Sequence, residues 1–121
     1  MIVVCLSHPY GGDPLNRAAA KSWMVWLADH GYAPVATWIT LTELWGEDRR
    51  DDGLEIDREL IARCDVMLLC GDRISDGMMR ECEFASEFGV PVVDVTGTSI
   101  DEYDPEIAVE VMISINKAVR A

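Results

Sequence analysis

DVMLLCGDRISDGMMRECEFA, residues 65–85, is the stretch that decides the fold. Its apolar run, 66–70, is typical of a strand that is buried on both faces of a parallel sheet. Gly71 ends the strand, and a polar turn leads to Ser75, a good N-cap for a helix that continues to about Phe88. The stretch therefore predicts one strand–turn–helix unit of an α/β fold.

One charged side chain lies on the apolar face of that predicted helix. Spacing of three and four residues places Glu81 on a stripe with Met78, Cys82, Ala85 and Phe88. A carboxylate on a packing face is costly to desolvate, so it needs a compensating role. Two interpretations remain open: Glu81 is a reactive group in a pocket, or it is a structural carboxylate bonded to nearby backbone N–H groups or to an arginine.

Length and charge limit what the chain can do. Its 121 residues, half of them hydrophobic, predict a single folded domain spanning 1–121. The formal net charge of −12 argues against a nucleic-acid polymer as partner, because phosphate backbones require a basic surface. A small anion held locally by backbone N–H groups stays possible.

The four cysteines have neither C-x-x-C nor zinc-ligand spacing. Cys5 and Cys70 fall in predicted buried strands, where cysteine behaves as a small apolar residue. Reduced thiols predict a cytoplasmic protein, and no signal peptide or membrane-spanning apolar run is visible. We expect no metal, no cofactor and no membrane partner.

The rest of the chain alternates strands with helices. In chain order we expect a strand at 2–6, a loop at 7–13, a helix at 14–30, a strand at 34–40, an irregular segment at 41–53, a helix at 54–64, a strand at 91–95 and a helix from 105. The irregular segment, a mobile loop or a short helix, has the length of a lid. The alternation predicts a flavodoxin-like or Rossmann-like three-layer α/β sandwich, whose parallel strands lie near the order 2-1-3-4.

Three features meet at the carboxyl edge of such a sheet, where ligands bind. They are the loop 7–13, Glu81, and Asp57, which is the only charge on the apolar stripe of its own helix. This convergence favours an active site over two unrelated structural acids. His8 in the loop is a general acid, a ligand or, more simply, a hydrogen-bonded loop histidine. Cys82 is interpreted as core, because no histidine is placed to activate it.

Two facing carboxylates suit cleavage of a glycosidic bond, with one at the anomeric carbon and the other handling protons. The Gly11-Gly12 turn matches neither a dinucleotide fingerprint nor a Walker A sequence, so a dinucleotide or nucleoside triphosphate site is poorly supported. A flavin carrier would need a Ser/Thr-rich phosphate loop after the first strand, which the chain lacks.

Asp57 and Glu81 belong to a longer sequence pattern. Asp57 is followed eight residues later by Asp65 and an apolar strand, then by SDGMMRECEFA at 75–85 and GVPVV at 89–93. In these motifs the chain resembles the nucleoside 2-deoxyribosyltransferase superfamily, over residues 2–95. The resemblance implies a small-molecule nucleoside or nucleotide as substrate.

The resemblance also implies roles. Glu81 would be the nucleophile that takes the deoxyribosyl group as a covalent intermediate, and Asp57 would contact the sugar and assist departure of the base. Ser75 stands where transferases tend to have an aspartate and where the related deoxynucleoside 5′-monophosphate N-glycosidases tend to have a phosphate-holding serine. The simpler alternative is that Ser75 is only an N-cap. Whether water or a second base accepts the sugar is left open.

The family often carries a tyrosine in the first strand that positions the glutamate, and here that strand reads IVVCL. Tyr10 can replace it only if the loop folds back. The candidate catalytic residues are Glu81, Asp57 and Tyr10, and the candidate substrate-binding residues are Ser7, His8, Gly11, Gly12, Ser75, Gly77 and Met78. Arg80 is a further candidate donor to a phosphate. A sensor that binds a nucleotide without turning it over is the competing class.

Large apolar side chains predict a homodimer or a larger homo-oligomer. Trp23, Trp26, Trp38 and Trp45, with Met78 and Met79, exceed what one small sandwich usually hides. The resembled family also builds its sites at subunit contacts. We therefore expect the polar loop 96–101 to contribute to a neighbour's pocket.

Overall fold

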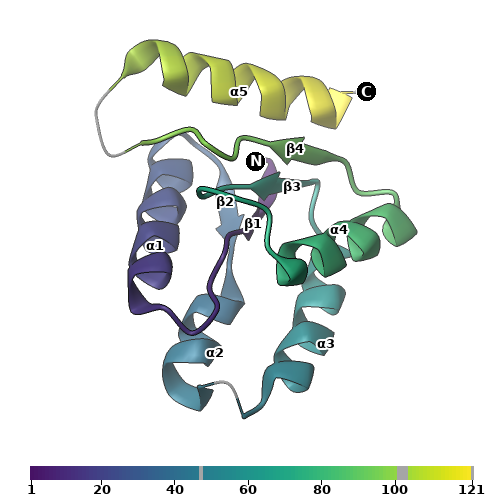
Figure 1. Cartoon of the computed structure of the whole chain (residues 1–121). Coiled ribbons are helices and arrows are strands. Elements are labelled where there is room, and N and C mark those ends of the chain that lie inside the picture. Colours follow the sequence, from purple (N-terminus) through teal and green to yellow (C-terminus); the bar gives the residue numbers. More distant parts are fainter. Residues whose placement is uncertain (47, 101–103, 121) are drawn as a thin grey trace.

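A four-stranded parallel sheet is at the centre of the computed structural model, which describes residues 1–46, 48–100 and 104–120 (Figure 1). In chain order the elements are β1 (Val3–Ser7), α1 (Pro14–Asp29), β2 (Ala33–Val35), α2 (Thr37–Trp45), α3 (Arg50–Ile61), β3 (Val66–Leu69), α4 (Asp76–Phe88), β4 (Val92–Asp94) and α5 (Pro105–Arg120). The strand order is β2-β1-β3-β4, with every pair parallel. The predicted α/β fold and strand order are confirmed.

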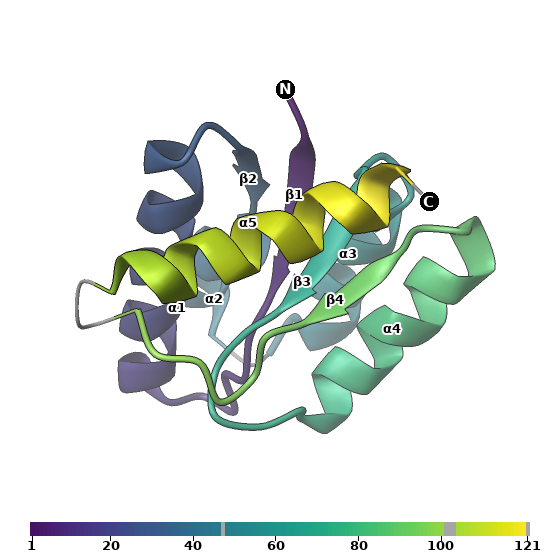
Figure 2. The same ribbon diagram turned by 90° about the horizontal axis from the view of Figure 1, so that it is seen from above.

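Helices cover both faces of this sheet. Between the sheet and the helices α1 and α5, one buried cluster contains Val4, Leu6, Trp23, Leu27, Val111 and Ile115. Between the sheet and the helices α3 and α4, a second cluster contains Cys5, Ile61, Met67, Leu69, Met78 and Ala85. Successive residues of β1 alternate between the two clusters, as the pleat of a strand requires. Figure 2 shows α5 lying across the sheet as the outer layer on its side.

Close backbone packing holds two loops together at the carboxyl edge of the sheet. Gly71, directly after β3, has a φ of +97°, and a Cβ placed there would lie 2.6 Å from Cδ of Pro9. Only glycine fits this contact without displacing the β1–α1 loop. At the start of α4, Ser75 Oγ accepts a hydrogen bond of 3.3 Å from the backbone N–H of Met78, so the predicted N-cap is confirmed.

The prediction of a second strand at 34–40 is wrong beyond its first two residues. β2 ends at Val35, and α2 begins at Thr37. The segment is rich in β-branched and aromatic residues, which favour strands, but packing overrides that preference. Ile39 is buried in the first cluster, and the indole N–H of Trp38 donates a 3.1 Å hydrogen bond to the carbonyl oxygen of Leu6.

For the segment 41–53, expected as a mobile loop or a short helix, the helical alternative holds over most of the described residues, whereas the helix start expected at 54 is wrong. α2 continues to Trp45, and α3 begins at Arg50 rather than at 54. Gly53 therefore lies inside α3. Glycine costs up to about 1 kcal/mol relative to alanine inside a helix, so its presence argued against a helix at this point of the sequence. The segment with the length of a lid therefore contains the end of α2 and the start of α3.

Candidate active site

A cavity of about 300 Å³ opens at the carboxyl edge of the sheet. The β1–α1 loop, α2 and the beginnings of α3 and α4 form its walls. Figure 1 shows the loop, α2 and the start of α3 together at the lower end of the molecule. The volume is at the lower end of the range for small-molecule sites, so the cavity suits a compact ligand.

Glu81 lies in this cavity and is only 7% exposed. Its Oε1 accepts a hydrogen bond of 3.0 Å from the hydroxyl of Ser7, the last residue of β1. Its Oε2 is buried and has no hydrogen-bond partner among the described residues. A carboxylate with one satisfied and one unsatisfied oxygen in a cavity is available for chemistry.

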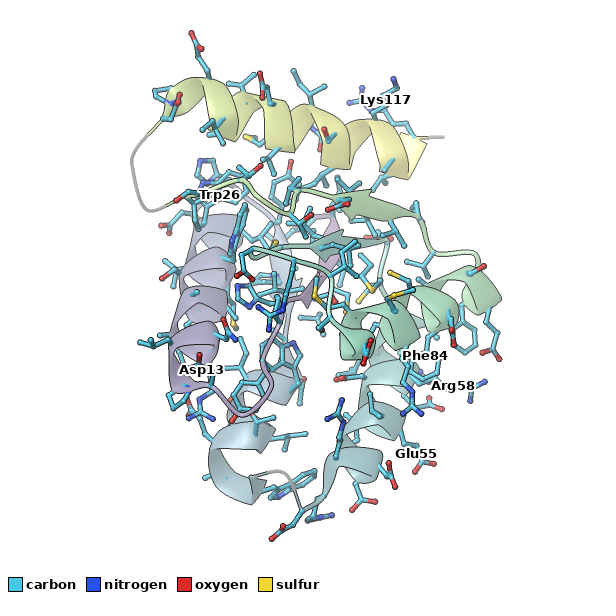
Figure 3. All side chains as sticks on the ribbon, viewed as in Figure 1. Asp13, Trp26, Glu55, Arg58, Phe84 and Lys117 are labelled. Atoms are coloured by element: carbon cyan, nitrogen blue, oxygen red, sulfur yellow. The ribbon has the colours of Figure 1, made fainter. Side chains whose placement is uncertain are left out.

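Asp57 of α3 lines the same cavity and is half-buried. Glu55 of the same helix points away from the protein in Figure 3, and Arg58 pairs at the surface with Glu87 of α4, so neither shares the face of Asp57. The sequence therefore places both acids correctly on the packing faces of α3 and α4. The structure brings them into one cavity, where the charge of Asp57 influences the titration of Glu81.

Burial governs the protonation of the two acids. Desolvation raises the pKa of Asp57 to about 7. Desolvation and then the negative charge of Asp57 raise the pKa of Glu81 to about 8, against the opposing effect of the Ser7 hydrogen bond. Because the two groups titrate together near neutrality, the pair retains a proton at pH 7. One ionised and one protonated carboxyl group is the state that glycosidic cleavage uses.

Aromatic rings also line the cavity. Tyr10, Trp38 and Trp45 all belong to its lining, and the ring centroids of Tyr10 and Trp38 are 6.1 Å apart. The guanidinium of Arg49 lies 3.8 Å from the centroid of the Trp45 ring. Flat aromatic surfaces of this kind stack on nucleobases.

Tyr10 lines the cavity, but its hydroxyl accepts a hydrogen bond of 2.9 Å from Nη1 of Arg17. The hydroxyl that contacts Glu81 comes from Ser7 instead. The sequence contains a signal for this contact, since Ser7 and Cys5 are two residues apart on a strand and so face the same side of the sheet.

The other candidate binding residues fall into three groups. His8, Gly11, Ser75, Gly77 and Met78 line the cavity. Ser7 is fully buried and does not line the cavity, but its hydroxyl donates the hydrogen bond to Glu81. Gly12 is exposed and is not among the residues that line the cavity.

Arginines surround the cavity in places that the sequence did not reveal. Arg49, Arg50 and Arg73 line it, whereas Arg80, the predicted donor, is exposed and lies outside it. A Cβ on Gly77 would lie 3.8 Å from Nη2 of Arg50 and 3.9 Å from Oγ of Ser75. The arginine therefore reaches the N-terminus of α4, where the helix dipole also favours an anion. The sequence signal that could have identified Arg49 and Arg50 was their position as an adjacent pair in the segment 41–53.

A family model of a domain of unknown function, DUF7768, matches residues 2–95. The chain belongs to the DUF7768 family. No curated protein sequence and no solved structure matches it. The DUF7768 region contains all four strands and every residue named above as lining the cavity, whereas α5 lies outside it.

Other chemistry in this DUF7768 chain is limited in the part that the structure describes. Cys82 is half-buried in α4, and burial raises the pKa of its thiol, which stays protonated at pH 7. Over 1–46, 48–100 and 104–120, no three His, Cys, Asp or Glu side chains gather closely enough to hold a metal ion. None of the described helices is both long and apolar enough to cross a lipid bilayer.

Proposed function

We propose that the chain cleaves the N-glycosidic bond of a deoxynucleoside or a deoxynucleoside 5′-monophosphate, with Glu81 as the nucleophile. The observation that carries the proposal is the buried, unpartnered Oε2 of Glu81 in a cavity that also holds Asp57. The aromatic lining gives a surface for the base. The resemblance to the nucleoside 2-deoxyribosyltransferase superfamily supports the same assignment.

The reactive form of the pair has Glu81 ionised and Asp57 protonated; it is the less populated of the two one-proton forms, because Asp57 has the lower pKa. In the proposed first step, Oε2 of ionised Glu81 attacks the anomeric carbon of the sugar. The C–N bond breaks, its electron pair goes to the base, and protonated Asp57 donates a proton to the base as it leaves. The sugar is then held as an ester of Glu81. The hydrogen bond from Ser7 keeps the other oxygen, Oε1, in place.

In the second step an acceptor attacks the same carbon, and the C–O bond of the ester breaks. Its electron pair returns to Glu81 as a carboxylate. Water as acceptor gives the free sugar, and a second base gives a new nucleoside. Asp57, now ionised, takes the proton of an incoming base, which is the reverse of its role in the first step.

The direct test is incubation of the purified chain with a panel of deoxynucleosides and their 5′-monophosphates. Free base is followed by chromatography, and the sugar ester by the intact mass of the protein. We expect release of base and a protein mass increased by one deoxyribosyl group, or by one deoxyribosyl 5′-phosphate group when the substrate is a monophosphate. No base released from any member of the panel would refute the proposed function.

We predict that a 5′-monophosphate is preferred over its free nucleoside. Ser75, Gly77 and Nη2 of Arg50 converge at the N-terminus of α4, where they form a cradle for a dianion. The long-range repulsion from a net charge of −12 is screened beyond about 8 Å at physiological salt. A charge-assisted hydrogen bond contributes about 1.5–3 kcal/mol, roughly a tenfold to hundredfold preference.

The ratio of kcat/KM for monophosphate and nucleoside measures this preference. Arg50→Ala is expected to lower the ratio about tenfold or more, and Ser75→Ala to lower it less, since its hydroxyl also caps α4. Arg80→Ala is the control, because it removes an exposed arginine of α4 that lies outside the cavity. A ratio of one in the wild type would contradict the phosphate cradle.

One observation favours a second candidate, a sensor that binds a nucleotide without cleaving it. The hydroxyl of Tyr10 contacts Arg17 rather than Glu81, so the tyrosine that positions the nucleophile in the resembled family has no direct equivalent. A sensor would bind a monophosphate in calorimetry and return it unchanged after prolonged incubation.

Assembly stays a prediction, on narrower grounds than the tryptophan count. Trp23 and Met78 are buried inside the single chain, and Trp26 and Trp38 pack against its core. Met79 of α4 is 57% exposed. We expect a homodimer, which sedimentation equilibrium at micromolar concentration tests; a stable species of 13.5 kDa would contradict it.

A further inference from the structure

A second cavity of about 250 Å³ lies at the same edge of the sheet. Its lining comes from α1, from Gly71 and Asp72 after β3, and from residues 97–100 after β4. Residues 97–100 of the polar loop that was expected to reach a neighbour's pocket therefore line a cavity of their own chain, and residue 101 lies outside the described residues. His8 lines both cavities, so it forms part of the boundary between them.

His8 is held in one tautomer. Its side chain is only 7% exposed, and Nδ1 lies 2.7 Å from the backbone carbonyl oxygen of Pro9. A carbonyl oxygen only accepts hydrogen bonds, so Nδ1 carries the proton and Nε2 has a free lone pair. In the part of the chain that the structure describes, no hydrogen bond to Nε2 is found.

The free nitrogen lies close to Gly71, which lines the second cavity. A Cβ on Gly71, a lining residue of that cavity, would lie 3.2 Å from Nε2. Burial lowers the pKa of His8, so its imidazole is neutral at pH 7 and can accept a proton. Neither step of the mechanism above uses this buried base.

The second cavity has the properties of a water site. Its volume holds several water molecules, and His8, Asp72, Thr98 and Ser99 supply polar groups around it. Water occupies internal space when the space is roomy and has polar partners. Polar side chains on three separate segments meet this condition.

We propose that His8 accepts the proton of the water that hydrolyses the Glu81–sugar ester, and that the second cavity supplies this water. The inference rests on the proposed function and specifies its second step. The water oxygen attacks the anomeric carbon, and the C–O bond of the ester breaks, with its electron pair returning to Glu81. The proton passes to Nε2 of His8 and then to solvent beside Asp72.

This arrangement separates the two fates of the ester. An incoming base re-enters the first cavity along the path of the departed base and gives its proton to Asp57. Water enters from the side of the second cavity and gives its proton to His8. Loss of His8 therefore slows hydrolysis much more than transfer to a base.

The test compares His8→Gln and Thr98→Leu with the control His30→Gln. Glutamine keeps a hydrogen-bond donor at position 8 but accepts no proton, and leucine at position 98 fills part of the second cavity while His8 itself is kept. His30 is matched to His8, since its Nδ1 also lies 2.7 Å from a backbone carbonyl oxygen, that of Trp26, while it lines neither cavity. Each variant is assayed for hydrolysis and for exchange of its base with a labelled free base.

We expect His8→Gln to release one base per chain in a burst and then to hydrolyse the ester at least about 100-fold more slowly than the wild type. Intact-mass measurement should show the deoxyribosyl adduct accumulating. Base exchange should fall much less than hydrolysis, because an incoming base gives its proton to Asp57. Thr98→Leu should show the same selective loss, and His30→Gln should show none.

Several outcomes overturn the inference. Equal losses of hydrolysis and exchange in His8→Gln would make His8 a residue that merely shapes the first cavity. Unchanged hydrolysis in both His8→Gln and Thr98→Leu would show that water arrives by another route. If the wild type releases no base at all, the proposed function fails and this inference fails with it, whereas base release without the selective loss refutes the inference alone.

Discussion

Replacing Glu81 with glutamine should abolish base release and, at the same time, stabilise the fold at alkaline pH. The amide keeps the volume of the side chain and can still accept the hydrogen bond from Ser7. It cannot attack the anomeric carbon, so the covalent route is lost. Removal of a nucleophile lowers kcat by orders of magnitude, and we expect a decrease of about 10³-fold or more.

The gain in stability follows from the pKa of the buried acid. Glu81 titrates at about 8 in the folded chain, against an ordinary value of 4.5 when the chain is unfolded. Between these values the folded state binds more protons, so the free energy of unfolding falls as pH rises from 4.5 through 8. Each pKa unit is about 1.4 kcal/mol, so the loss reaches a few kcal/mol above pH 8. Glutamine does not titrate, so the variant does not lose this stability as the pH rises.

Thermal unfolding at several pH values measures this effect. The Tm of Glu81→Gln should exceed that of the wild type by an amount that is small near pH 4.5 and largest above pH 8. Glu83→Gln is the matched control, since it removes an exposed glutamate two residues along the same helix. Full base release by Glu81→Gln, or a Tm difference that does not grow with pH, would make Glu81 an ordinary structural acid.

Asp57→Asn should slow base release by about 10²–10⁴-fold, the range for loss of a general acid. The loss should be largest for substrates whose base leaves poorly, because these need the proton most. For bases that leave readily as anions, the variant should approach the wild type. A uniform, mild loss across all substrates would contradict a proton-donating role for Asp57.

The pH profile of kcat/KM gives an independent reading of the same variant. The wild type needs ionised Glu81 and protonated Asp57, so its profile should rise and then fall, with apparent pKa values near 7 and 8 that belong to the pair. Asp57→Asn should lose the alkaline limb and keep a single rise. The midpoint of that rise should fall below 8, because the negative charge that helps raise the pKa of Glu81 is gone. Glu55→Gln, on the outward face of α3, should keep the full profile.

Periodicity predicted the parts of this fold that are buried between regular elements. The apolar run 66–70 and the stripe through Glu81 each identify one face, and alternation of strands with helices then determines the sheet order. The meeting of Glu81 and Asp57 follows from that topology, since the helices that follow parallel strands begin at the same edge. These features depend on short-range patterns, which a sequence displays directly.

Other features depend on contacts between distant segments. Trp38 belongs to a helix because its indole N–H reaches Leu6 and its neighbour Ile39 enters the core, and no local pattern announces either contact. Arg50 approaches Gly77 across two helices, so its place beside the cavity was invisible before the packing of α3 against α4 was known. The position of His8 between two cavities also depends on how loops that are distant in the sequence pack together, so it could not be predicted from the sequence.

The separate origins of the acids and the rings have an evolutionary consequence. Glu81 and its partner Ser7 belong to α4 and β1, which are built into the sheet and its layers, whereas two of the three aromatic rings belong to α2 at the end of the molecule. Mutations in α2 can alter which base is accepted while the nucleophile and its hydrogen bond stay in register. Reactivity and selectivity can therefore diversify at different rates among descendants of one ancestral gene.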